Sequence, residues 1–150
     1  MRCPHCLRGK SQNINIDTKY IDKMLSMVIG VGVILFTGGE PSLHPEITRY
    51  TVDKMKELNI PLERFSVVTN GMIANDNFIS ALNYINDYTI HSRKNYFSIS
   101  NDIYHLGGEH VNVDLFKRNF EILKKLPYYQ YGDDFNNSYD HYVMYEGMAA

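Results

Sequence analysis

The sequence has no tryptophan and only two cysteines among its 150 residues. Two cysteines cannot build a disulfide framework, which argues against a small disulfide-stabilised secreted domain. No apolar run approaches the ~18 residues that a membrane-spanning helix requires, and nothing at the N-terminus resembles a signal peptide. The net charge is only −2, which gives no electrostatic reason to expect binding to nucleic acid or to a membrane surface. These absences indicate a cytoplasmic protein.

What is present is the composition of an ordinary globular domain. Hydrophobic residues make up 44% of the chain and charged residues 21%, a balance that allows a buried core and that disordered chains lack. A length of 150 residues suits one domain and is too short for two full-sized cores. We therefore expect residues 1–150 to form a single domain.

Short runs of β-branched and aromatic residues recur at a spacing of roughly 30 residues, at 33–37, 65–69 and 96–100. A fourth run, 142–145, follows after a longer connection. Most of these runs are apolar at successive positions, which predicts strands covered on both faces in a parallel sheet. The connection at 127–140 is rich in Tyr, Asp and Asn and is predicted to be an irregular surface loop.

Segments of helical periodicity alternate with the predicted strands. Their boundaries are cap residues, prolines or a glycine: Asp17 to Gly30, Pro45 to Asn59, Asn75 onwards, and Asn112 to Pro127. In the first segment, an apolar stripe that includes Tyr20, Ile21 and Leu25 predicts a buried face. Alternating strands and helices at this spacing predict βαβ units and an α/β fold, either a piece of a TIM-like barrel or an open doubly wound sheet.

Polar residues and glycines follow the ends of the predicted strands. These strand-end motifs are Thr37-Gly38-Gly39-Glu40-Pro41, Thr69-Asn70-Gly71, Ser100-Asn101-Asp102 and Glu146-Gly147. In a parallel α/β sheet, the carboxyl ends of the strands open onto one rim, where ligands bind. We therefore expect the four motifs to converge on a binding site.

The two cysteines form a C-x-x-C motif, Cys3-Pro4-His5-Cys6, in the segment before the first predicted helix. Two thiolates three positions apart can chelate one soft metal centre. By itself the motif is typical of a zinc half-site, of a redox pair, or of part of an iron–sulfur site. His105 and His110 could complete a Cys₂His₂ zinc site with the two cysteines.

Together, the cysteine motif, Gly38-Gly39-Glu40-Pro41 and Thr69-Asn70-Gly71 resemble the start of a radical S-adenosylmethionine (SAM) core. Members of that superfamily have partial or full TIM barrels, with a C-x-x-x-C-x-x-C loop after the first strand and Gly-Gly-Glu-Pro after the second. Cys3 and Cys6 match the second and third cysteines of the loop, and the position of the first precedes Met1. The resemblance implies a partial TIM-type (βα) barrel with about four visible parallel strands. It also implies an incomplete core that lacks the first strand and the C-terminal part.

The resemblance also implies roles for individual residues. Cys3 and Cys6 would bind a [4Fe–4S] cluster, and His5 would pack beside the cluster or the adenine of SAM. Gly38, Gly39 and Glu40 would hold the methionine ammonium of SAM. Pro41 would fix the turn. Contacts to the carboxylate or ribose of SAM would come from Thr69, Asn70, and Ser98 or Ser100, and Asn101 and Asp102 are candidates for the ribose or the substrate. Two alternatives come from the residues themselves: Glu40 as a helix cap and Asn70 as a turn residue.

The activity implied by the resemblance is reductive cleavage of SAM into methionine and a 5′-deoxyadenosyl radical, which abstracts hydrogen from a substrate that the sequence does not specify. An electron donor such as flavodoxin or ferredoxin would be a partner, and no catalytic residue is assigned. The alternative is a non-catalytic or degenerate α/β module, stabilised by zinc through Cys3, Cys6 and His105 or His110.

Overall fold

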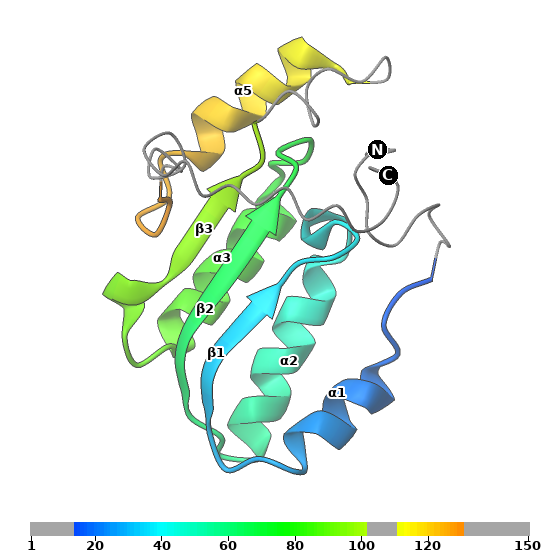
Figure 1. Cartoon of the computed structure of the whole chain (residues 1–150), viewed down its shortest axis with the longest axis vertical. Helices are drawn as coiled ribbons and strands as arrows, with labels where there is room; N and C mark the ends of the chain where they lie inside the picture. Colours follow the sequence, from blue (N-terminus) through cyan, green and yellow to red (C-terminus); the bar gives the residue numbers. More distant parts are fainter. Residues whose placement is uncertain (1–13, 102–110, 131–150) are drawn as a thin grey trace, which may run out of the picture.

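A computed structural model describes residues 14–101 and 111–130 of the chain (Figure 1). Its three strands are β1 (Val31–Phe36), β2 (Leu62–Thr69) and β3 (Tyr96–Ile99). Its α-helices are α1 (Thr18–Leu25), α2 (Pro45–Glu57), α3 (Asp76–Tyr88) and α5 (Val113–Leu123), and two short 3₁₀ helices are η1 (Pro41–Leu43) and η2 (Ser92–Lys94). None of the helices in this part of the chain has the length and apolar character needed to cross a membrane.

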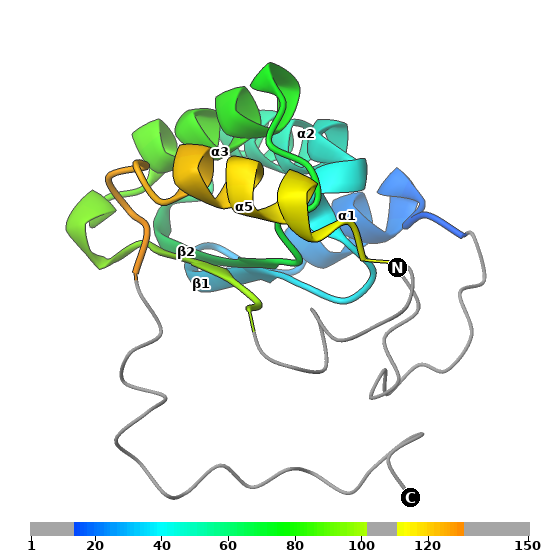
Figure 2. The same ribbon diagram turned by 90° about the horizontal axis from the view of Figure 1, so that it is seen from above.

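The strands form one parallel sheet in the order β1-β2-β3. Helices α2, α3 and α5 lie on the same side of that sheet (Figure 2). Sequential parallel strands with helices on one side form the wall of a (βα) barrel, whereas a doubly wound sheet carries helices on both faces. The α/β prediction is therefore confirmed, and of the two architectures the partial barrel is the one observed.

The predicted helix starts are confirmed by the capping contacts. The side chain of Asp17 accepts a hydrogen bond from the backbone N–H of Lys19 at the start of α1. Asn75 and Asn112 cap α3 and α5 in the same way, each accepting from the backbone N–H three residues further on. Such side-chain oxygens satisfy N–H groups that the first turn of a helix leaves unpaired.

Two helices end earlier than predicted. Helix α1 stops at Leu25 rather than near Gly30, because the Ser26 hydroxyl donates to the Lys23 carbonyl oxygen (2.8 Å) and the chain turns there. Ile21 and Leu25 are buried as expected, but Tyr20 is 61% exposed. Helix α5 likewise ends at Leu123 and not at Pro127.

The prediction that the strands are covered on both faces is wrong for β1. Val33 is 46% exposed and Leu35 is 55% exposed, on the face opposite to the helices. In a barrel that face looks inward and is covered by the side chains of the other strands. Within residues 14–101 and 111–130, no helix lies across it (Figure 2).

The prediction of a surface loop is wrong at its first residues. The Phe97 N–H donates to the Tyr128 carbonyl oxygen (3.1 Å), and the Gln130 N–H donates to the Phe97 carbonyl oxygen (2.9 Å). Tyr129 thereby forms a parallel bridge with Phe97, which extends the sheet to a fourth position beside β3. The strand predicted at 142–145 lies outside the described residues.

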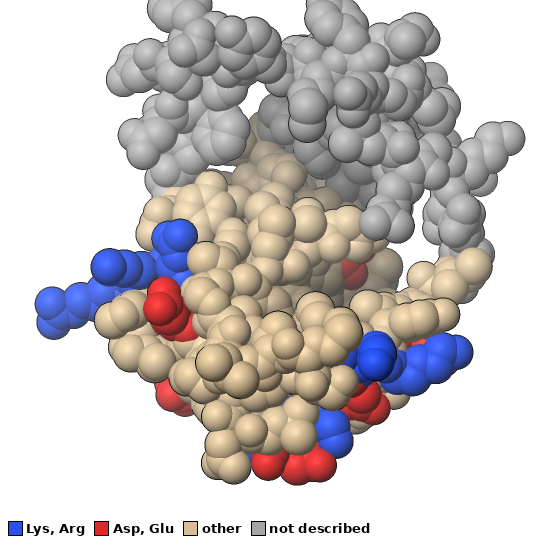
Figure 3. Space-filling view, turned by 60° about the horizontal axis from the view of Figure 1, so that its bottom comes forward, with Lys and Arg blue, Asp and Glu red and all other residues tan. Residues whose placement is uncertain are grey.

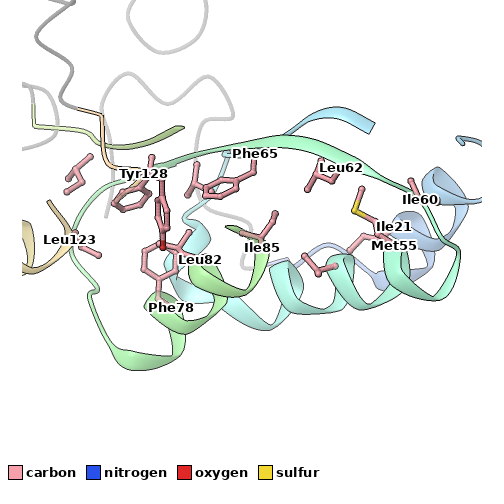
Figure 4. Close-up of a cluster of buried hydrophobic side chains, with 14 of the residues drawn as sticks. Ile21, Met55, Ile60, Leu62, Phe65, Phe78, Leu82, Ile85, Leu123 and Tyr128 are labelled. Atoms are coloured by element: carbon pink, nitrogen blue, oxygen red, sulfur yellow. The ribbon is translucent and has the colours of Figure 1, made fainter. Parts of the chain in front are cut away.

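The core lies between the sheet and the helices (Figure 4). Phe65, Phe78 and Phe97 are fully buried. Tyr128 packs edge-on against Phe65, with ring centroids 5.4 Å apart, and against Phe97, at 6.2 Å. Edge-to-face aromatic pairs of this kind add about 0.5–1.5 kcal/mol to the gain from burial, so Tyr128 secures the fourth position of the sheet.

The buried Tyr128 makes stability sensitive to alkaline pH. Burial, with a smaller contribution from the charge of Asp87, raises the pKa of the Tyr128 phenol well above its ordinary value of 10.0. A raised folded-state pKa gives stability that is complete below the unfolded-state pKa of about 10 and declines as pH rises above it. We expect unfolding curves of Tyr128→Phe to depend less on pH above about pH 10 than those of the wild type. The exposed Tyr20→Phe serves as the control, and a wild-type slope in Tyr128→Phe would contradict the prediction.

Positively and negatively charged side chains do not form separate patches at the lower end of the molecule. On the face shown in Figure 3, Lys and Arg lie near Asp and Glu along the edge, and most of that surface is uncharged. A nucleic-acid interface usually presents a continuous basic stripe, and this face has none.

Candidate functional site

The carboxyl end of β1 leads into an exposed double-glycine turn. Gly38 and Gly39 both have φ of 71°, in the left-handed region that glycine adopts without strain. A β-carbon added at Gly39 would meet no atom within 4 Å, so the turn borders open space. In the described part of the chain, no hydrogen bond uses the peptide groups of these two glycines. Their carbonyl oxygens are therefore available to a ligand.

The next residue, Glu40, joins this turn to the end of β2. Its Oε1 accepts hydrogen bonds from the Thr69 hydroxyl (2.6 Å), the Ser42 hydroxyl (2.7 Å) and the Ser42 N–H (3.1 Å). Its Oε2 accepts from the Asn70 N–H (2.8 Å). We call these four residues the Glu40 bridge. All the donors are neutral, and no Lys or Arg within the described ranges forms an ion pair with Glu40.

Glu40 also caps the short helix η1. It is the residue before Pro41, which opens that helix, and its side chain accepts from the Ser42 N–H. The helix-cap interpretation of Glu40 is thus observed for η1. A carboxylate has about four lone-pair positions, and Oε2 uses one of its two, so capping leaves room for one more donor. The predicted contact with an ammonium group is compatible with this geometry.

The Thr69-Asn70-Gly71 segment is held by its own hydrogen bonds. The Thr69 hydroxyl also accepts from the Gly71 N–H (3.3 Å), and Asn70 Oδ1 accepts from the Met72 N–H (2.9 Å). The latter contact is an Asx turn, so Asn70 is a turn residue, but the positive φ in this loop belongs to Gly71. The side chain of Asn119, on α5, donates to the Gly71 carbonyl oxygen (3.1 Å). This loop is therefore fixed from both β2 and α5.

The third strand end lies beside the second. The Ser100 N–H donates to the Thr69 carbonyl oxygen (2.9 Å), which continues the pairing of β2 and β3 beyond Ile99. Ser98 pairs in register with Val68 and is half-buried. Because side chains alternate along a strand and Ile99 is buried on the helix side, Ser98 and Ser100 lie on the opposite face. Both hydroxyls are placed beside the rim.

The structure brings together the rim residues that the sequence identified at the ends of β1, β2 and β3. Asn101 is exposed at the end of the third motif. The predicted residues Cys3, His5, Cys6, Asp102, His105 and His110 lie outside the described ranges. In residues 14–101 and 111–130, no group of three or more His, Cys, Asp or Glu side chains could hold a metal ion.

Sequence reasoning missed Ser42 and Asn119. Ser42 is 2% exposed and follows Glu40 by two residues, the spacing at which a side-chain oxygen of one residue meets the N–H of the other in a cap. Asn119 is buried in the apolar stripe of α5, between Phe116 and Leu123. A polar residue inside an apolar stripe was the available signal, since buried amides require partners.

This fold is that of a partial (βα) barrel, and barrels of this kind bind ligands at the carboxyl ends of their strands. A comparison with known families matches residues 1–129 to the radical SAM superfamily. The chain belongs to that superfamily, and the predicted membership is confirmed. A GTP 3′,8-cyclase from Chlorobaculum tepidum is 31% identical over 77 residues, which is 49% of this chain and 23% of that protein. The chain thus spans about a quarter of that relative. No solved structure matched this chain.

Proposed function

We propose that this chain forms part of an enzyme that cleaves SAM reductively and passes a 5′-deoxyadenosyl radical to a substrate. The observation that carries the proposal is the exposed Gly38-Gly39 turn joined to Glu40, whose carboxylate bonds only to neutral donors among the described residues. Membership of the radical SAM superfamily supports the same chemistry. When bound, a reduced [4Fe–4S] cluster supplies the electron for cleavage, and an electron donor such as flavodoxin or ferredoxin would reduce it.

The residues at the rim fit the amino-acid part of SAM. Carbonyl oxygens of Gly38 and Gly39 and the free lone pair of Glu40 Oε2 are acceptors, which suit an ammonium donor. Pro41 fixes the direction in which the chain leaves this turn. Thr69 and Asn70 hold the neighbouring loop, and the Ser98 and Ser100 hydroxyls offer donors for a carboxylate or ribose oxygen.

The proposed cluster ligands are Cys3 and Cys6, with His5 between them. Thiolates are the usual protein ligands of [4Fe–4S] clusters, so the donor chemistry of the C-x-x-C motif fits. The superfamily motif contains a third cysteine four positions before Cys3. We therefore expect a poorer yield of cluster from the 150-residue sequence than from a version extended upstream with a cysteine at that position.

The ligand assignment is tested by anaerobic reconstitution of the extended version. Cys3→Ala and Cys6→Ala should each lose most bound iron and should release only background amounts of 5′-deoxyadenosine from SAM, because each removes a thiolate ligand. His91→Ala, an exposed change at the other end of the sheet, is the control and should behave as the parent. Iron content is measured by absorbance and electron paramagnetic resonance, and 5′-deoxyadenosine by chromatography. Normal release from either cysteine variant would show that the assignment is wrong.

A further inference from the structure

The Thr69 hydroxyl has no donor left for a ligand in this structure. Thr69 is 1% exposed. Its hydroxyl donates its proton to Glu40 Oε1 (2.6 Å), and the hydroxyl oxygen accepts from the Gly71 N–H (3.3 Å). A hydroxyl has one donor, so a direct bond from Thr69 to a cofactor oxygen would require the bond to Glu40 to break. The hydroxyl contacts of Thr69 favour a role through Glu40 over the predicted direct donation to the cofactor.

The Glu40 bridge spans two strand ends that are not otherwise connected by a side-chain hydrogen bond among the described residues. Glu40 and Ser42 follow β1, whereas Thr69 and Asn70 end β2. Three donors converge on Oε1 and one on Oε2. This uneven distribution of hydrogen bonds fixes the rotation of the Glu40 carboxylate and directs the free lone pair of Oε2 to one side. A charged acceptor held this way loses little freedom when a ligand binds.

We propose that Thr69, supported by Ser42, is a positioning residue that orients the Glu40 carboxylate for SAM. The proposal rests on the proposed function of the rim. Neither hydroxyl touches the cofactor; each acts by bonding to Oε1, so that Oε2 and the preceding glycine carbonyls face the ligand together. Removal of the Thr69 hydroxyl should release the carboxylate to other rotamers and weaken SAM binding, while a serine at 69 should preserve it.

The first test measures SAM affinity by calorimetry on the reconstituted, upstream-extended chain. Hydrogen bonds to charged groups contribute about 1.5–3 kcal/mol, so Thr69→Val should weaken binding about tenfold or more. Thr69→Ser should stay within about twofold. Ser42→Ala should lose less than Thr69→Val, because the Ser42 N–H still donates to Oε1. Thr51→Val is the matched control: it removes another buried hydroxyl, which bonds to Ile47 inside α2.

A double-mutant cycle separates positioning from direct contact. If Thr69 acts through Glu40, Thr69→Val should cost no further affinity in a Glu40→Ala background, because effects on one network are not additive. Additive losses would mean that Thr69 contacts SAM itself, and would overturn the proposal. So would wild-type affinity in Thr69→Val.

Hydrogen exchange of the cluster-free chain gives a readout that needs no cofactor. The Ser42 and Asn70 amides both donate to Glu40, so they should exchange faster in Thr69→Val and at the wild-type rate in Thr69→Ser, relative to Thr51→Val. Unchanged exchange would overturn the positioning role. If the wild type binds no SAM, the proposed function fails, and exchange still decides whether Thr69 holds Glu40.

Discussion

Gly71→Ala is expected to lower the free energy of unfolding by about 2–5 kcal/mol. Gly71 has φ of +70°, and an added β-carbon would lie 2.8 Å from Ile99 Cγ2 and 2.9 Å from Phe116 Cε2. The left-handed conformation costs an alanine roughly 1–2 kcal/mol. Overpacking adds about 1–3 kcal/mol, because both neighbours are buried. The sum is a large part of the 5–15 kcal/mol that stabilises a typical domain.

Gly39→Ala is the matched control for this substitution. Its φ is +71°, nearly that of Gly71, but its β-carbon would meet nothing within 4 Å. It should therefore lose only the conformational part, about 1–2 kcal/mol. Urea unfolding of both variants, followed by circular dichroism, measures the difference directly. Equal losses in the two variants would show that the contact of the Gly71 loop with β3 and α5 is looser than the structure indicates.

Asn95→Leu is expected to produce the second large loss of stability. Asn95 is 1% exposed, and its Oδ1 accepts from the Phe65 N–H (3.0 Å) at the point where β2 lies beside the start of β3. Its Nδ2 donates to Asn86 Oδ1 (2.9 Å), in the last turn of α3, and to Thr89 Oγ1 (2.8 Å), directly after that helix. Leucine has a similar size but would leave these groups without their partner.

Each buried polar group left unpaired costs about 1–3 kcal/mol, so the expected loss for Asn95→Leu is about 3–5 kcal/mol. Asn101→Leu, an exposed change on the same face of the molecule as the rim, should change the free energy of unfolding by less than about 0.5 kcal/mol. Denaturant unfolding of both variants measures the effect. A loss below about 1 kcal/mol for Asn95→Leu, roughly the value of one hydrogen bond, would mean that water or a shifted backbone replaces the amide.

Local signals predicted the starts of the helices well. The side chains of Asp17, Asn75 and Asn112 accept hydrogen bonds from N–H groups two or three residues away. Their capping role can therefore be predicted from the adjacent sequence. The early end of α1 depends on how the Ser26 side chain turns, and a serine at that position is equally common inside a helix. The exposure of Val33 and Leu35 depends on which elements cover the sheet, which hydrophobicity alone does not encode.

The sequence analysis did not predict that Tyr128 and Tyr129 occupy a fourth position in the sheet, although the spacing between paired strands indicated it. Val33 pairs with Arg64, Val67 pairs with Phe97, and Phe97 pairs with Tyr129, so each step is about 30 residues. The polar residues that follow Tyr131 favoured a loop over a strand. Continuing the same spacing from Phe97 would have identified Tyr128 and Tyr129 as sheet residues.

The rim motifs were predictable because parallel neighbours end at the same edge of a sheet. Glu40 and Thr69 could thus be placed close together from the sequence. Which groups Glu40 would contact could not be predicted, because the choice between a ligand, a helix cap and Thr69 depends on side-chain rotation in three dimensions. The sequence predicts Gly71 to be a turn residue. The steric clash of an added methyl group with Ile99 and Phe116 is known only from their packing in the structure.

Pairing of each strand with the next one in the chain has a consequence for synthesis on the ribosome. In residues 14–101 and 111–130, β2 and β3 each pair with the strand about 30 residues earlier in the chain, so the loops to be closed are short. The β1–α2–β2 unit can form while α3 is still being translated, and β3 then adds to a finished edge. Until β3 is added, the edge of β2 stays unpaired, and parallel pairing is slow, so the growing chain is exposed to aggregation at this stage.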